Sequence, residues 1–89
     1  MTHYRSQQQI VVEVLEVSTS NIAVTDLCRK ANLPYGRLVS FTKNLMSSGL
    51  LNKIEYDGKN TFVITEKGRL YLKEYKHFSD IAESFGLEM

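Results

Sequence analysis

The segment from Tyr35 to Ser48 is rich in side chains that donate hydrogen bonds, and it contains no acid. Arg37 carries paired donors that fit the two acceptors of guanine, Asn44 carries the donor and acceptor that fit adenine, and Ser40 suits either base. Lys43 is better suited to a phosphate oxygen, a contact that positions a protein on a duplex without reading its sequence. These residue types favour a surface that binds nucleic acid.

The charges of the chain are unevenly distributed, although their formal sum is only +1. Residues 21–48 contain one acid and four cations, whereas residues 71–89 contain four acids and two lysines. A basic middle beside an acidic end indicates one face for a polyanion and another face for a different partner. On charge alone, an ordinary solvated surface is the alternative. The four cations are Arg29, Lys30, Arg37 and Lys43.

A helix is predicted to begin at Thr25, a favourable capping residue, and to end before Pro34, which disfavours helical geometry in the preceding residue. Its outer face is basic, with Arg29 and Lys30 available for phosphates. Its inner face consists of small and apolar residues, which are Leu27, Cys28 and Ala31. We interpret Cys28 as a buried apolar residue, with a redox-sensing thiol as the alternative.

The next helix is predicted to run from Tyr35 to Ser48, and Gly49 supplies the left-handed position that ends it. Because about three residues join the two helices, they should cross steeply as a helix-turn-helix, whose second helix lies in the major groove of DNA. The predicted inner stripe is Leu38, Phe41, Leu45 and Met46. The outer face that remains is Tyr35, Gly36, Arg37, Ser40, Lys43, Asn44 and Ser47.

Two strand-like runs follow, from Leu50 to Tyr56 and from Thr61 to Thr65, around the hairpin signal Asp57-Gly58. The hairpin tip adds Lys59 and Asn60, and Lys53 flanks it, so the hairpin can act as a wing on the DNA backbone or minor groove. Two acids, Glu55 and Asp57, partly cancel this charge. The alternative is a hairpin that only closes the sheet. In either case we expect Ile54, Phe62 and Ile64 to pack on the helices.

The remaining elements complete a recognisable order. A capping box at Ser6 and Gln9 predicts a first helix, residues 22–24 suit a brief strand, and Thr65 caps a last helix that reaches about Ser84. The fold class is therefore α+β, mainly α, a winged helix-turn-helix: helix, short strand, helix, helix, two-stranded wing, carboxy-terminal helix. With 89 residues, the chain is expected to form one domain over residues 1–89.

The last helix, with residues 66–85 as the expected dimerisation segment, carries a short heptad seam. Apolar side chains recur at alternating spacings of 4 and 3, the pattern of a helix that pairs with a second helix. They are Tyr71, Tyr75, Phe78, Ala82 and Phe85. Leu70, Leu72 and Ile81 lie off the seam and are expected to pack on the domain's own core. The seam predicts a homodimer; the alternative is that these aromatic residues cover the first helix.

No catalytic, cofactor-binding or metal-binding arrangement emerges from the sequence. His3 and His77 have no neighbouring ligands at metal spacing, a single cysteine excludes an intramolecular disulfide, and no phosphate-binding glycine loop is present. We therefore expect no enzyme activity and no cofactor or small-molecule ligand. No run approaches the length of about 18 apolar residues that spans a bilayer, and the first residues lack the apolar core of a signal peptide, so we expect a cytoplasmic protein.

Three segments resemble landmarks of archaeal winged helix-turn-helix proteins, and the similarity extends from Tyr4 to Tyr75. They correspond to the turn into the recognition helix, the step from that helix into the wing, and the step from the wing into the last helix. They are Ala-Asn-Leu-Pro-Tyr at 31–35, Leu-Met-Ser-Ser-Gly-Leu-Leu at 45–51 and Ile-Thr-Glu-Lys-Gly at 64–68. The resemblance implies DNA binding through Arg37, Ser40, Lys43 and Asn44, with Lys59 on the wing.

The chain resembles in particular the small archaeal chromatin-associated proteins that dimerise through a long carboxy-terminal helix. It departs from them in a shorter last helix and a less basic composition, so a local transcription regulator fits as well as an architectural protein. The alternative from a different class is a protein-interaction adaptor. Cations on both the recognition helix and the wing favour DNA, whereas exposed apolar residues there would favour the adaptor.

Overall fold

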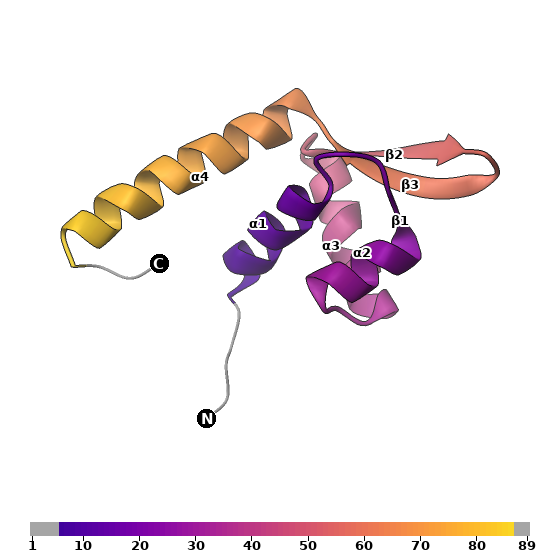
Figure 1. Ribbon diagram of the computed structural model, residues 1–89, viewed down its shortest axis with the longest axis horizontal. Helices are drawn as coiled ribbons and strands as arrows, with labels where there is room; N and C mark the ends of the chain where they lie inside the picture. Colours follow the sequence, from indigo (N-terminus) through magenta and orange to yellow (C-terminus); the bar gives the residue numbers. More distant parts are fainter. Residues whose placement is uncertain (1–5, 87–89) are drawn as a thin grey trace.

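The computed structural model describes residues 6–86, apart from the side chain of Tyr56. It confirms the predicted order of elements: an α+β, mainly helical chain with a three-stranded antiparallel sheet in the order β1-β3-β2 (Figure 1). The elements are α1 (Gln7–Val17), β1 (Ile22–Ala23), α2 (Val24–Ala31), α3 (Tyr35–Ser47), β2 (Leu51–Tyr56), β3 (Lys59–Ile64) and α4 (Glu66–Ser84).

Local signals set most helix ends as expected. The Ser6 hydroxyl accepts a hydrogen bond from the amide of Gln9 at 3.1 Å, and the Gln9 side chain accepts one from the Ser6 amide at 2.9 Å. At α4, the Thr65 hydroxyl accepts from the Gly68 amide at 3.0 Å. Gly49 has the left-handed φ of +78° just after α3, as its position predicted. These caps satisfy amides that the first helical turn leaves without partners.

The prediction that Thr25 caps α2 is wrong. This helix begins at Val24, which was expected in the strand, and Ala23 precedes it in an extended conformation without a side-chain cap. The reason is the sheet, because β1 pairs Ala23 with Thr61 and holds the chain extended up to that residue. Asp26 lies in the first turn, where its carboxylate accepts a hydrogen bond from Arg29 at 2.9 Å.

The hairpin turns at Asp57 and Gly58, whose φ angles of 53° and 76° are both positive. This is the backbone that a two-residue turn needs to match the twist of its strands, and it explains the Asp-Gly pair. The turn fixes a register in which Lys53 lies opposite Phe62 and Leu51 lies opposite Ile64. Since alternate residues of a strand share a face, these four side chains lie on the same face of the hairpin.

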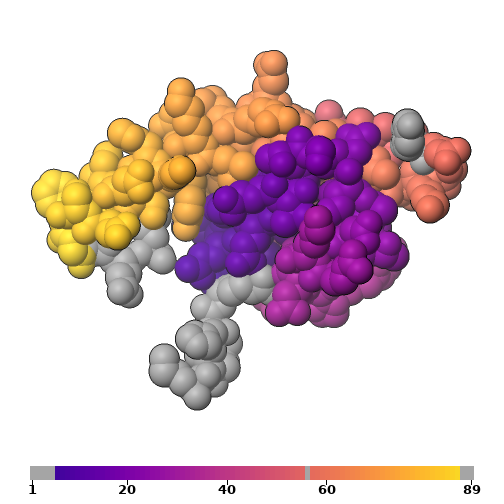
Figure 2. Space-filling view, in the orientation of Figure 1, coloured from indigo at the N-terminus to yellow at the C-terminus, as the bar shows by residue number. Residues whose placement is uncertain are grey.

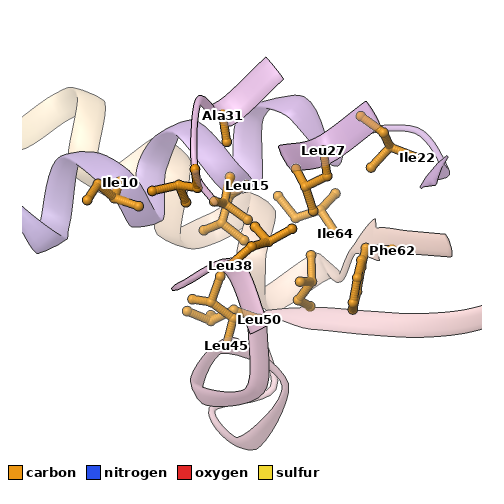
Figure 3. Packing of buried hydrophobic residues seen from close by; sticks show 13 residues of the cluster. Ile10, Leu15, Ile22, Leu27, Ala31, Leu38, Leu45, Leu50, Phe62 and Ile64 are labelled. Atoms are coloured by element: carbon orange, nitrogen blue, oxygen red, sulfur yellow. The ribbon is translucent and has the colours of Figure 1, made fainter. Parts of the chain in front are cut away.

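The core lies between the first three helices and the inner face of the sheet (Figure 3). Its most deeply buried members are aliphatic side chains of α1, α2 and α3 and Leu51 of β2, with Phe62 and Ile64 closing it from β3. Cys28 is half-buried against this cluster, as are Phe41 and Met46. The buried residues of the three helices include Ile10, Val14, Leu15, Leu27, Ala31, Leu38 and Leu45.

α4 leaves the sheet on the side opposite the wing and runs past α1, so that the molecule is elongated, 48 × 33 × 19 Å (Figures 1 and 2). Its first turn approaches the sheet so closely that a Cβ at Gly68 would collide with the Leu50 carbonyl oxygen and with Ile64. Within residues 6–86, none of the helices combines the length and the apolar character that a membrane span requires.

Candidate nucleic-acid interface

The inner face of α3 is apolar and anchors the helix on the core. Leu38 and Leu45 are buried there, and so is Thr42, whose hydroxyl donates a hydrogen bond to the Val39 carbonyl at 3.1 Å. The opposite face is exposed to solvent. It carries Tyr35, Gly36, Arg37, Ser40, Lys43, Asn44 and Ser47, the whole outer face that the sequence predicted.

A recess of about 350 Å³ separates this helix from the wing. From α3, Tyr35, Val39 and Lys43 contribute to its lining; from the wing, Lys53 and Asn60 do. Its lining also includes apolar side chains, but no carboxylate. The recess is therefore an apolar depression with a lysine on each side, a surface that favours an anion with an apolar part.

Strand register explains why Lys53 faces α3. It shares a face of β2 with buried Leu51 and pairs with Phe62, whose side chain also lines the recess. The neighbouring residue, Ile54, points to the other face and is 40% exposed. The expectation that Ile54 packs on the helices is therefore wrong, whereas Phe62 and Ile64 are buried as expected.

A second recess, of about 580 Å³, lies where the starts of α2 and α3 meet the wing tip. Tyr35 and Asn60 line both recesses, and Lys59 lines this second one together with Asp26. The structure thus brings five predicted site residues from α3 and the wing into one continuous surface. They are Tyr35, Lys43, Lys53, Lys59 and Asn60.

The other predicted site residues are exposed but do not line these recesses. The guanidinium of Arg37 lies over the Phe41 ring, 5.8 Å from its centroid, a cation–π contact that holds it on the far flank of α3. Ser40 and Asn44 are exposed on the same helix. On α2, Arg29 is paired with Asp26, while Lys30 is exposed at the same end.

Sequence reasoning missed Val39, which it assigned neither to the inner stripe nor to the outer face. In the structure its side chain is 41% exposed and lines the recess beside the wing. Its position four residues after Tyr35, outside the buried stripe, was the available signal. Together with Tyr35, which is 65% exposed, it gives this polar surface an apolar flank.

α4 has two apolar faces, as the sequence indicated, but their members differ from those predicted. Tyr71 and Leu72 pack against the core, Tyr75 is half-buried beside α1, and Ala82 is buried. The expectation that Leu70 and Ile81 pack on the core is wrong, because they are 56% and 42% exposed. Helical geometry places those two on the outer face with Phe78 and Phe85. We call Leu70, Phe78, Ile81 and Phe85 the outer apolar face of α4; all four are exposed.

Metal-binding groups are not evident in the part of the chain that the structure describes, where no three His, Cys, Asp or Glu side chains come together. His77 is exposed on α4, and His3 lies outside the described residues. Cys28 is a free thiol.

The sequence profile of the winged helix-turn-helix family matches residues 4–83. Sso10a-2, a DNA-binding protein from Sulfolobus solfataricus, is similar in structure, with a TM-score of 0.80 and 23% identity over 91% of this chain and 85% of that one. F93 from STIV, a winged-helix DNA-binding protein, matches with a TM-score of 0.68 and 20% identity over 86% of this chain and 90% of that one.

SSV1 F-93 is also similar, with a TM-score of 0.66 and 20% identity over 94% of this chain and 97% of that one. At these identities the structural likeness concerns the fold. It confirms the resemblance to archaeal winged-helix proteins that the three sequence landmarks indicated. No curated protein sequence matches this chain.

Proposed function

Because this chain belongs to the winged helix-turn-helix family, we propose that it binds double-stranded DNA as a transcription regulator or a small architectural protein. α3 is the recognition helix in the major groove, and the wing contacts the backbone or the minor groove. The chain acts by binding and not by catalysis. The DNA-binding names of Sso10a-2 and STIV F93, which share the fold, support this proposal.

One observation carries the proposal: the helix α3 and the wing that follows it direct their lysines to a common surface. Lys43 of α3 and Lys53 of β2 line the same recess, whose lining contains no acid, and Lys59 extends that surface at the wing tip. Uncompensated cations on a recess favour a polyanion. Lys43, Lys53 and Lys59 then contact phosphates, while Arg29 and Lys30 extend the basic surface along α2.

Base reading falls to the outward side chains of α3. Ser40 and Asn44 suit base edges, and Arg37 fits guanine when its guanidinium leaves the Phe41 ring. Tyr35 and Asn60 lie where α3 and the wing approach each other. In the proposed complex they contact the DNA strand that runs between these two elements.

A salt titration of binding to a random-sequence duplex tests the proposal. Three or four phosphate contacts in each subunit of a dimer give roughly six to eight contacts, and such a protein loses about three to five decades of affinity between about 50 and 200 mM salt. Lys59→Ala should weaken binding to all sequences equally and reduce the salt slope by about one per site.

Lys73→Ala is the matched control, because it removes an exposed lysine of α4 from the groove beside α1 and leaves the wing intact. Its salt slope should equal that of the unaltered protein. At about 50 mM salt the counterion-release contribution to binding is large. If neither random nor genomic duplexes are retained there, the proposal of DNA binding is wrong.

A protein-interaction adaptor is the second candidate, and the exposure of Tyr35 and Val39 favours it. Apolar side chains on a recognition surface suit a protein partner that buries them. The lysines on both α3 and the wing weigh against this reading, since an adaptor has no need of cations on both elements. Retention of duplex DNA in the salt titration decides between the two candidates.

We also propose that the chain forms a homodimer through the outer apolar face of α4. Phe78, Ile81 and Phe85 follow each other at spacings of 3 and 4, as in a helix that pairs with a second helix. Exposed apolar side chains in one patch indicate an interaction surface. The predicted seam therefore changes its members. Tyr71, Tyr75 and Ala82 leave it because they face the domain, Leu70 and Ile81 join it, and Phe78 and Phe85 remain.

A further inference from the structure

Gly36 occupies a position where the fold has no need of glycine. It lies in the first turn of α3, its φ is not in the left-handed region, and an added Cβ would meet nothing within 4 Å. Glycine weakens a helix relative to alanine, because it loses more backbone freedom on folding. The missing side chain is therefore unexplained by anything within the described residues.

Val39 stands three residues further along the helix, so it adjoins Gly36 on the helix surface. Its side chain is 41% exposed, although a β-branched residue in an exposed helical position also disfavours the helix. Together the two residues form a small apolar area that borders the recess through Val39 and has Ser40 and Lys43 as polar neighbours on the outer face.

The chemistry of the major groove identifies a partner for such an area. Base edges there present donors, acceptors and a single apolar group, the C5 methyl of thymine. Gly36 lets the base edge come close to the helix backbone, and the methyl groups of Val39 can then pack against the thymine methyl. On the polar side, Ser40 and Lys43 remain available for a base acceptor and a phosphate.

We propose that Val39, with Gly36 beside it, recognises the C5 methyl group of a thymine. This inference rests on the proposed binding of α3 in the major groove, and it makes Val39 a specificity-determining residue. A deoxyribose is the other apolar group of DNA, and packing against a sugar would not depend on the base. A duplex without the C5 methyl group therefore distinguishes the two contacts: its affinity falls if Val39 contacts the methyl group and is unchanged if Val39 contacts a sugar.

The test compares two duplexes that differ only in that methyl group. A preferred duplex is selected from a random library and synthesised once with thymidine and once with deoxyuridine, which keeps every charge and every hydrogen-bonding group. The unaltered protein should bind the thymidine duplex about fourfold more tightly for each methyl contact. Val39→Ala should bind both duplexes equally, with the affinity that the unaltered protein has for the deoxyuridine duplex.

Ile54→Ala is the control, because Ile54 is a similarly exposed aliphatic residue that lies on the other face of β2 and does not line the recess. This variant should keep the preference for thymidine. An unchanged thermal transition of Val39→Ala shows that the fold is intact.

Two results overturn the inference and leave DNA binding standing. One is equal, salt-dependent binding of both duplexes by the unaltered protein. The other is that Val39→Ala binds both duplexes more weakly by the same factor and keeps the preference for thymidine. The Val39 side chain would then contact a sugar. If no duplex is retained at low salt, the proposed function itself fails.

Discussion

α3 and α4 are both amphipathic helices packed on the same domain, yet their outward faces differ in chemistry. The outward face of α3 is polar and basic with one aliphatic residue, Val39, at its edge. The outward face of α4 exposes Leu70, Phe78, Ile81 and Phe85 among charges of both signs.

One small domain therefore exposes two surfaces of different chemistry. A polyanion gains little from the outer face of α4, and a second apolar helix gains little from the lysines of α3. The inner faces of the two helices serve the same purpose, since both bury aliphatic or aromatic side chains against the domain. Function on this scaffold is therefore assigned by what each helix leaves exposed.

The largest effect is expected on dimerisation, when the outer apolar face of α4 is made polar. Replacing Phe78 and Ile81 by serine removes four apolar side chains from a dimer, each worth about 1.5–3 kcal/mol when fully buried. Sedimentation at micromolar concentration should show twice the 10.2 kDa chain mass for the unaltered protein and one chain mass for the double variant. An unaltered protein that stays monomeric at high concentration would contradict the dimer.

The next effect concerns the inner face of α3. Leu45 is 4% exposed, so Leu45→Ala should cost about 2–5 kcal/mol of unfolding free energy, as large-to-small core changes do. Leu70→Ala is the matched change on the outer face of α4, and it should leave the unfolding free energy of the monomer within about 0.5 kcal/mol. Urea denaturation at a concentration that keeps the chains monomeric measures both; the reverse ranking would mean that these helix faces are assigned wrongly.

A smaller effect shows whether Arg37 of α3 contacts a base or a phosphate. Arg37→Ala should cost about 1–3 kcal/mol of binding free energy at a preferred site and relax discrimination at one base pair. Its unfolding free energy should change by no more than about 0.5 kcal/mol. Binding to a set of single-base variants of the preferred duplex measures this. A uniform loss on all of them would make Arg37 a phosphate contact.

The smallest effect tests the glycine of the same surface. Gly36→Ala should raise the unfolding free energy by about 0.5–1 kcal/mol, because alanine favours the helix and its Cβ meets no atom within 4 Å. The same change should lower the affinity for DNA, since the methyl group stands between the helix backbone and the base edge. Opposite signs for stability and affinity support a close approach by DNA. A gain in both would exclude it.

Much of the fold could be predicted because its signals are local. The Ser6 and Gln9 pair, the left-handed Gly49 and the Asp57-Gly58 turn each act within a few residues, and each lies where the sequence indicated. Thr25 shows the limit of such signals, since pairing between β1 and β3 moved the start of α2 to Val24.

The candidate site divides in the same way. Exposure of the polar residues of α3 followed from the spacing of the apolar stripe, so Ser40 and Lys43 could be placed from the sequence. That Lys53 and not Ile54 would face this helix depended on strand register, which the turn and the core fix together. Val39 escaped notice because it fits neither pattern: it lies outside the spacing of the buried stripe, and it is apolar, unlike the outer face that was defined by its polar residues.

The order of the elements, most of their boundaries and the cluster of cations in the middle of the chain follow from the sequence alone. These properties depend on backbone propensity, capping and turn geometry within a few residues of each position. The rotation of α4 about its axis, and the set of side chains from α3 and the wing that share a recess, depended instead on tertiary packing. Several apolar residues of α4 could have faced inward; close packing of α4 at Gly68, with Tyr71 and Leu72 against the core, selected one rotation and left Leu70, Phe78, Ile81 and Phe85 outside.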